Sequence, residues 1–496
     1  MAEETGMSQT TDKERQDRMQ YIFSRVEKMK QAKDNYSVNW PAYEKQWKMF
    51  DEGKSGEDSW RASLPDTWAY ATVKTAQSAF LDSEVMPVFA RREDEDSSKA
   101  TDLRDLYIYI SDKGDLKQEL YYARLDAFKL GNGFLELAYV DDEREVHEVK
   151  SYDADTRKIE YEKKKVKDFD DPRATRVSPY LMFVDELCRA NFNTARDCAK
   201  VEILGYEDAK RIYGKYVENW DKTITKSGVM KLAERELAAT SVGQLAQTAA
   251  ESAIKDDRVK TFRFFAPIEV ADDEVQILHY YNKIPDDTYE IIIQNVAVKV
   301  KTSQDPSPNP FIHKQLPFIT LQYSPYSGDE FWAAGIIETI MAEVKALQQH
   351  REMMSDRQRL SLFSPAFADV NSEIDQRQLK LKPLQIIRTK GGVPRQFQIP
   401  GITNADLALK KDYEDAVKRV SGVDERLLGS VGGKSRMTAT EISFIRESSL
   451  ARLREFMFLY KQSLIREVRL MVKMFEQYYS SPLKREEIVK EYTGVK

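Results

Sequence analysis

The stretch from His313 to Leu360 constrains the fold more than any other, because one kind of regular structure gives way to another within it. The apolar run from Phe318 to Tyr323 predicts a short strand. Pro317 and Pro325 bound this run, and proline cannot donate a hydrogen bond to a sheet. The period of the apolar pattern changes after this strand.

Apolar residues then recur every three or four positions from Ile336 to Leu347, which predicts a helix that Ser327 or Asp329 caps. No proline interrupts the pattern before Pro365, so the helix is expected to end near residue 364. It would be about 50 Å long at about 1.5 Å per residue. Residues 348–359 are almost all polar, and such a helix either bridges solvent or packs among polar neighbours. An ordinary surface helix is the alternative.

With 496 residues the chain is too long for one core, and two to four structural units are expected. A net charge of -6 argues against tight binding of DNA phosphates, and residues 163–165 form the only compact basic run. No apolar run reaches the roughly 18 residues that cross a bilayer. The first residues lack the pattern of a secretory signal, so we expect the protein to stay where it is made or to be carried elsewhere by assembly.

Metal and redox chemistry find little support in the sequence. Cys188 and Cys198 are the only cysteines, and they are predicted to be buried or free thiols in a reducing compartment. The four histidines are scattered and form no HxH or HxxxH pair. We therefore expect no metal and no cofactor.

The remaining patterns predict a mostly helical α+β protein, because helices and strands alternate without the regular spacing of a doubly wound sheet. Helices are expected at residues 18–30, 40–50, 64–86, 103–110, 116–130, 194–201, 206–216, 230–255, 405–420 and 442–479. Strands are expected at residues 134–140, 180–184, 260–265, 275–281, 289–294, 296–301 and 381–388, with a charged hairpin at 146–167.

Motifs of catalysis are missing or incomplete. Residues 429–435 resemble a phosphate-binding loop, but the glycines are one residue too close and no strand precedes them. Gly131 and Gly133 are read as a helix cap. The acidic pairs at residues 170–171, 272–273 and 286–287 could bind a metal for nuclease chemistry, although such pairs are usually turn residues. We predict no catalytic residues and no enzyme activity.

The order of features is more specific than any single motif. Residues 315–318, the segment from Phe331 to Glu338 that opens the long helix, residues 420–423, and residues 438–441 with Arg446 and Arg452 following resemble the portal proteins of tailed bacteriophages. The resemblance covers roughly residues 60–480. It implies a ring, usually of twelve copies, at one capsid vertex of the virion, assembled in the host cytoplasm.

In this resemblance DNA passes through the ring without sequence readout during packaging and ejection. The implied partners are the terminase packaging motor, the head–tail adaptor, and the major capsid and scaffolding proteins, with no membrane. The implied parts are an N-terminal helical extension (1–59), wing (60–226), first stem helix (227–257), clip (258–325), second stem helix (326–364), strand and tunnel loop (365–403), inner helix with a glycine-rich loop (404–437) and crown (438–496).

The resemblance also implies three groups of functional residues. The tunnel loop facing DNA comprises Lys390, Gly391, Gly392, Pro394, Arg395, Gln396, Phe397 and Gln398. The stem includes Phe331, Trp332, Gly335, Glu338, Arg351 and Arg357. The clip surface facing its partners includes Asp286, Asp287 and Tyr289. The alternatives are another head–tail or capsid-associated structural protein, and a metal-dependent nuclease that uses the acidic loops.

Overall fold

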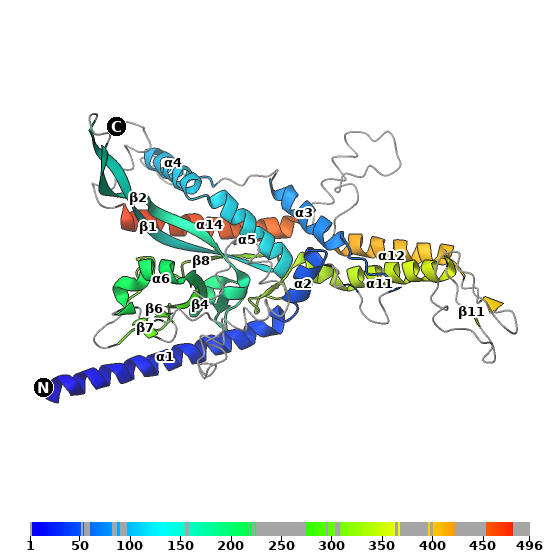
Figure 1. The fold of residues 1–496 in the computed structure, drawn as a ribbon, viewed down its shortest axis with the longest axis horizontal. Coiled ribbons are helices and arrows are strands. Elements are labelled where there is room, and N and C mark those ends of the chain that lie inside the picture. The colour runs from blue at the N-terminus through cyan, green and yellow to red at the C-terminus, as the bar shows by residue number, and fades with distance from the viewer. Residues whose placement is uncertain are drawn as a thin grey trace. The chain divides into compact units, whose positions relative to one another are not determined.

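The computed structural model describes residues 2–50, 53, 60–81, 87–89, 97–153, 158–217, 219–220, 224, 274–293, 296–302, 308–362, 366–367, 395–396, 400–421 and 453–479 (Figure 1). It is an α+β structure, as predicted. The chain divides into two compact units. Unit 1 contains residues 1–41, 83–335 and 454–496, and unit 2 contains residues 42–82 and 336–453.

The described helices of unit 1 are α1 (Ala2–Ser37), α4 (Ser97–Lys113), α5 (Leu116–Leu130), α6 (Tyr206–Tyr213) and α14 (Leu453–Tyr478). Its strands are β1 (Asn132–Asp153), β2 (Lys158–Val177), β3 (Met182–Val184), β4 (Asp197–Gly205), β5 (Glu274–Asn282), β6 (Thr288–Ile293), β7 (Val296–Lys299), β8 (Phe318–Gln322), β9 (Ser324–Pro325) and β10 (Ala333–Ala334). The elements of unit 2 are α3 (Trp68–Leu81), α11 (Ile336–Leu362), α12 (Asn404–Ser421), β11 (Ala366–Phe367) and β12 (Arg395–Gln396). Helix α2 (Trp40–Trp47) begins in unit 1 and lies mostly in unit 2.

The larger sheet of unit 1 joins five of the described strands in the order β3-β4-β5-β6-β7, all antiparallel. Alternate residues of a strand face opposite sides of a sheet. Leu278 and Tyr280 of β5 therefore pack in the cluster that contains Ile22 and Val26 of α1. Val275 and Ile277 of the same strand pack with α6 on the other face. The sheet is thus covered by a helix on each side.

The second sheet joins β2, β1 and β8 of the described chain. Gly131 ends α5 with φ 94°, as the sequence predicted for a helix cap. A side chain at Gly131 would overlap the carbonyl of Ala333, and one at Gly133 would overlap that of Ala123. These two glycines allow α5, β1 and β10 to approach one another at backbone distance.

The predicted hairpin at residues 146–167 is confirmed but is longer than expected. β1 and β2 pair from Phe134 and Val177 to Asp153 and Lys158, with irregularities at residues 142–143 and 149–151. β8 pairs only with Asn132 to Glu136 on the other edge of β1. The rest of the hairpin is a two-stranded ribbon within the described chain.

In unit 2, α11 and α12 form an antiparallel pair of helices (Figure 1). α3 packs against α11. Apolar residues of α11 are buried from Ile336 to Leu347, as their spacing predicted. None of the described helices is long and apolar enough to cross a membrane.

The long helix begins later than predicted, and the prediction that Ser327 or Asp329 caps it is wrong. Ala333 and Ala334 pair with β9, so the chain is extended until Gly335 and α11 starts at Ile336. Phe331, Trp332 and Gly335, which were expected in the second stem helix, therefore precede it. Its predicted end is close to the observed Leu362.

The helix predicted at residues 194–201 is also wrong. This segment is largely β4, whose residues pair with β3 and β5 on either side. Cys198, Ala199 and Val201 are buried in this sheet, and tertiary pairing here outweighs local propensity.

Most other predictions within the described residues are confirmed. They include α5, β8, α12 and the strands β5 to β7. The break between the first two helices lies after Ser37, close to the predicted position. Residues 60–226 and 258–325, predicted as separate regions, contribute strands to the same two sheets.

Several predicted features lie outside the described residues, and the assignment of ranges to portal parts stays a prediction. These features are the first stem helix (227–257), the strands at 260–265 and 381–388, the glycine-rich loop (429–435) and the capping box (438–441).

Candidate functional site

The polar half of α11 is the predicted stem surface, and it is occupied by two segments of the same unit. On one side lie residues 60–66. Arg351 forms an ion pair of 3.2 Å with Asp66, whose side chain is fully buried. Glu352 accepts a hydrogen bond of 3.2 Å from the backbone N–H of Leu64. Asp356 accepts one from the N–H of Ala62, so α11 supplies the acceptors that this extended segment needs.

Asp66 also begins the next helix. Its second oxygen accepts a hydrogen bond of 2.8 Å from the backbone N–H of Trp68, the first residue of α3. The helix begins at Trp68, two residues after the start predicted at residues 64–66. One buried carboxylate both caps α3 and pairs with Arg351 of α11.

The start of α12 occupies the other side of α11. Arg357 donates to the carbonyl of Pro400 and to Asp406, both at 2.9 Å. Thr403 and Asp406 exchange hydrogen bonds as a capping box does. Hydrogen bonds from the Thr403 backbone and hydroxyl, together with the charge of Arg357, hold the pKa of Asp406 below its usual value. His350 lies 2.9 Å from the Asp406 carbonyl.

A groove of about 430 Å³ runs along α11. Trp60 and Arg61 form one wall, and the residues from Gln349 to Leu360 that lie on one face of α11 form the other. Met353 in this groove is 64% exposed. The groove combines an aromatic ring, an apolar side chain and charges of both signs, a composition common in protein–protein contacts.

The C-terminal half of α11 and most of α12 have no buried core among the described residues. No residue is buried from Gln348 to Leu362 or from Gly401 to Ala416. Large apolar side chains are nevertheless exposed on these two segments: Met353, Leu362, Ile402, Leu407 and Leu409. Two helices that bury so little have weak support for their own stability, since most helical stability comes from tertiary packing.

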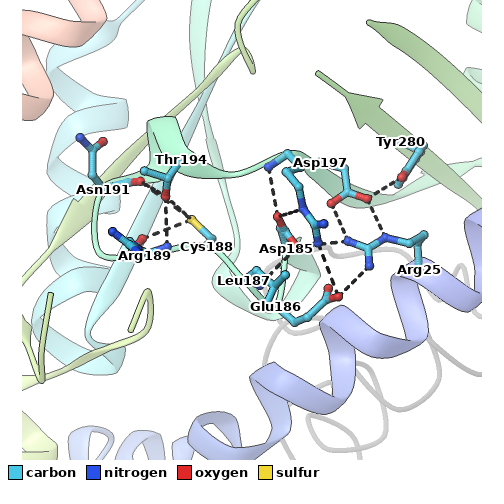
Figure 2. Close-up of polar contacts among 11 residues, drawn as sticks. Arg25, Asp185, Glu186, Leu187, Cys188, Arg189, Asn191, Thr194, Asp197 and Tyr280 are labelled. Carbon is cyan, nitrogen blue, oxygen red and sulfur yellow. Dashed lines mark hydrogen bonds and ion pairs between the residues drawn. The ribbon is translucent and has the colours of Figure 1, made fainter. Parts of the chain in front are cut away.

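A second polar site, which the sequence did not predict, attaches α1 to the larger sheet. Figure 2 shows Arg25 of α1 between the carboxylates of Asp185, Glu186 and Asp197. The distances from its guanidinium are 3.1 Å to Asp185, 2.7 Å to Glu186 and 2.9 Å to Asp197. Tyr280 donates a further 2.6 Å hydrogen bond to Asp197.

The titration of these groups follows from the same contacts. The hydrogen bond to Asp197 raises the pKa of Arg25 further above its ordinary value despite partial burial. Burial alone would raise the pKa of Asp185, but hydrogen bonds from the side chain and backbone of Arg196 lower it to about 2. Arg25 and Asp185 therefore stay charged across the physiological range.

The other predicted site residues are placed as follows. Phe331 and Trp332 are buried in unit 1, and a side chain at Gly335 would overlap the carbonyl of Lys129. Glu338 lies half-buried in the first turn of α11. The rings of Phe331 and Trp332 contact each other, with 5.3 Å between their centroids.

Only two residues of the predicted tunnel loop are described. Arg395 and Gln396 form β12, which pairs with Phe367 and Ala366 of β11. Lys390, Gly391, Gly392, Pro394, Phe397 and Gln398 lie outside the described residues.

The predicted clip surface is engaged in intramolecular contacts. Asp286 pairs with Arg18 at 3.5 Å and with Lys301 at 3.2 Å. Asp287 accepts hydrogen bonds from Asn309. The Tyr289 hydroxyl lies 2.8 Å from His279 Nδ1.

Asp170 and Asp171 also have partners, with Tyr139 and Tyr479 donating to them. Asp272 and Asp273 are not described. No group of three or more side chains that could hold a metal ion occurs among the described residues. Cys188 and Cys198 are free and buried, as predicted.

No model of a known protein family matches the chain, and no curated protein matches its sequence.

Proposed function

We propose that this chain is the subunit of a phage portal, a ring through which double-stranded DNA enters and leaves the capsid. Two lines of support meet here. The order of sequence motifs resembles that of portal proteins. Helix α11, from the range predicted as the second stem helix, and α12, from the range predicted as the inner helix, expose apolar side chains that their own chain leaves uncovered among the described residues.

The α11–α12 pair carries the proposal. Large apolar side chains that are exposed on two neighbouring helices are typical of surfaces that bind other proteins. A second copy that packs on α12 would bury Leu407, which is 52% exposed. When each copy uses one face to bind the next, repetition closes into a ring if the rotation allows it.

The charge of the chain suits a conduit. With a net charge of -6 the protein neutralises few phosphates, so DNA slides past instead of being retained. Contacts to the DNA backbone carry no base information, which matches a channel for any sequence. In this proposal the terminase motor supplies the energy, and the head–tail adaptor and the capsid and scaffolding proteins bind the outside of the ring at the capsid vertex.

The test is the mass and shape of the purified chain, measured by mass photometry and negative-stain electron microscopy. We expect particles with a central hole and a mass that is an integer multiple of 57.4 kDa, at roughly ten to thirteen copies. A chain that remains monomeric up to the highest soluble concentration, alone and when co-expressed with scaffolding protein, would refute the proposal.

One pair of variants at a single position tests the surface. Leu407→Glu places a charge where we expect apolar burial and should abolish the ring, whereas Leu407→Met keeps an apolar side chain of similar volume and should preserve it. Circular dichroism establishes that both variants fold. Rings of equal abundance from both variants would show that α12 does not face a neighbouring copy.

A further inference from the structure

Helix α14 contains an arginine, Arg466, whose charge has no counter-ion among the described residues. Its Nε atom is buried and has no hydrogen-bond partner. The guanidinium lies over the ring of Phe192, 5.1 Å from the ring centre. Burial lowers the pKa of Arg466 to about 10. The nearby thiols of Cys188 and Cys198 are uncharged, because burial raises the pKa of both. A buried cation without a counter-ion is destabilising, so an anion is expected beside it.

Arg466 lies on the side of α14 that contacts the segment 310–320. Ser463 and Gln477 of α14 each donate a hydrogen bond of 2.7 Å to a backbone carbonyl of this segment. Residues three, four or seven positions apart share one face of a helix. Arg466 and Lys473 therefore lie on the same face as these two donors and between them along the helix. No ion pair or hydrogen bond of the described chain includes either cation.

His313 of the same segment provides a third donor. Its ring is 8% exposed and stacks on Phe311. Nδ1 accepts a hydrogen bond of 3.0 Å from the backbone N–H of Gln315, so the hydrogen of the neutral ring is on Nε2. Nε2 is buried and has no partner. Burial and the charges of Lys473 and Arg466 lower the pKa of His313 to about 4, so the ring is neutral near pH 7.

The charges of these groups indicate which anion fits. Arg466 and Lys473 supply two positive charges, and the neutral ring of His313 supplies an N–H. The carboxylate of Asp287 also acts on His313, but it accepts a hydrogen bond of 3.0 Å from Asn309 and pairs with neither cation in the described chain. Hydrogen phosphate has two negative charges and several acceptor oxygens, and guanidinium groups bind such oxygens in pairs. A carboxylate or a phosphodiester has only one charge.

We propose that Arg466, Lys473 and Nε2 of His313 bind a hydrogen-phosphate ion where α14 contacts the segment 310–320. Lys473 is exposed, so the ion can enter from solvent on that side. The bound ion would supply the missing counter-ion of Arg466 and link α14 to the segment, which stabilises unit 1. The site lies within one copy of the chain, so this inference goes beyond the proposed function and does not rest on it.

The test measures the binding of labelled inorganic phosphate to the full chain by equilibrium dialysis. The pH is slightly alkaline, and chloride keeps the ionic strength constant. We expect one saturable site per chain and a thermal unfolding midpoint that rises with phosphate concentration. Arg466→Met should weaken binding about ten- to a hundredfold, because charged hydrogen bonds are lost. Without phosphate, this variant should unfold at the same temperature as the natural chain or a higher one, since it buries no unpaired charge.

Two further variants complete the test. Lys473→Met changes an exposed residue, so it should fold normally and weaken phosphate binding about tenfold, which keeps the test decisive even if Arg466→Met folds poorly. Arg469→Met is the matched control, because it removes the same charge from an exposed position of the same helix. Its affinity for phosphate should equal that of the natural chain. Circular dichroism establishes which variants fold.

Three results would overturn the inference. The first is the absence of saturable phosphate binding to the natural chain. The second is an equal loss of affinity in Lys473→Met and Arg469→Met, which would show only a general attraction to the positive charge of α14. The third is displacement of labelled phosphate by acetate or a short DNA duplex as readily as by unlabelled phosphate, which would show no preference for a doubly charged ion. None of these results depends on whether the chain forms a ring.

Discussion

Glu467 should make the stability of unit 1 depend on pH in an unusual direction. It lies on α14 with no exposed surface and accepts a 2.8 Å hydrogen bond from the hydroxyl of Tyr107. Its other oxygen, Oε1, has no hydrogen-bond partner. Burial raises the pKa of Glu467 from 4.5 to about 7, against the opposing effect of the Tyr107 hydrogen bond.

The sign and size follow from proton linkage. Between pH 4.5 and 7 the folded chain holds a proton on Glu467 that the unfolded chain has released. The free energy of unfolding therefore falls as the pH rises through this window. A difference of about 2.5 pH units corresponds to roughly 3 kcal/mol, which is fully lost above pH 7.

The substitution Glu467→Gln removes the charge and keeps an oxygen that can accept from Tyr107. We expect the variant to match or fall slightly below the natural chain at pH 5, because the amide NH₂ is buried, and to exceed it at pH 8. The measurement is the thermal unfolding midpoint from pH 4.5 to 8.5 at constant ionic strength, compared between the two chains. Taking that difference cancels the contributions of the other titrating groups to the pH dependence. One of them is His313, because burial and the charges of Lys473 and Arg466 lower its pKa to about 4.

The matched control is Glu476→Gln, an exposed glutamate on the same helix. Its difference from the natural chain should be small and independent of pH. If the Glu467→Gln difference were equally flat, Glu467 would be ionised in the folded chain at pH 5, and the argument from burial would be wrong.

Three further predictions concern the other buried charges. Arg25→Met should leave the buried Asp185 and Asp197 short of a partner and lower the free energy of unfolding by about 3–5 kcal/mol. The measurement is amide hydrogen exchange in α1, which should be faster in Arg25→Met and intermediate in Arg25→Lys. Unchanged exchange would contradict the prediction. Burial lowers the pKa of Lys33 from 10.5 to about 7, so unfolding free energy should rise with pH across that window, and Lys33→Met should abolish the rise in thermal midpoint. Asp66→Asn keeps an acceptor for the N–H of Trp68 but loses the ion pair with Arg351, whereas Asp66→Ala loses both contacts. The alanine variant should therefore be less stable than the asparagine variant by about 1 kcal/mol, measured by thermal unfolding. Equal losses of stability would show that the cap contributes nothing.

The parts of the fold that the sequence predicted are those with local signals. Helix α5 ends at Gly131 because only a residue tolerant of positive φ fits there, and β8 lies between prolines. The predictions for β4 and for the start of α11 were wrong, because the conformation of these two segments depends on strands elsewhere in the chain. Ala333 and Ala334 have no strand propensity of their own, yet they pair with β9.

The cluster around Arg25 had no local signal either, since Arg25 and Asp197 are 172 positions apart. A faint pattern existed in α1. Arg18, Arg25 and Lys33 recur at intervals of seven and eight residues on the face that carries Ile22, Val26 and Met29. Basic residues on an apolar face predict polar partners beneath. Arg18 and Arg25 meet carboxylates, whereas Lys33 donates to backbone carbonyls of the sheet segment, and nothing in the sequence identifies these partners.

The polar half of α11 changes the argument for a ring. From the sequence, residues 348–359 could bridge solvent or pack among polar neighbours, and neighbouring subunits were one source of such partners. The structure supplies these partners within unit 2, from residues 60–66 and 400–406. The polar residues therefore no longer call for a second copy. The remaining argument for a second copy is a set of exposed apolar side chains that no described residue covers: Met353, Leu362, Leu407 and Leu409. Substituting them distinguishes a helix on the surface of a monomer from a helix at a subunit interface.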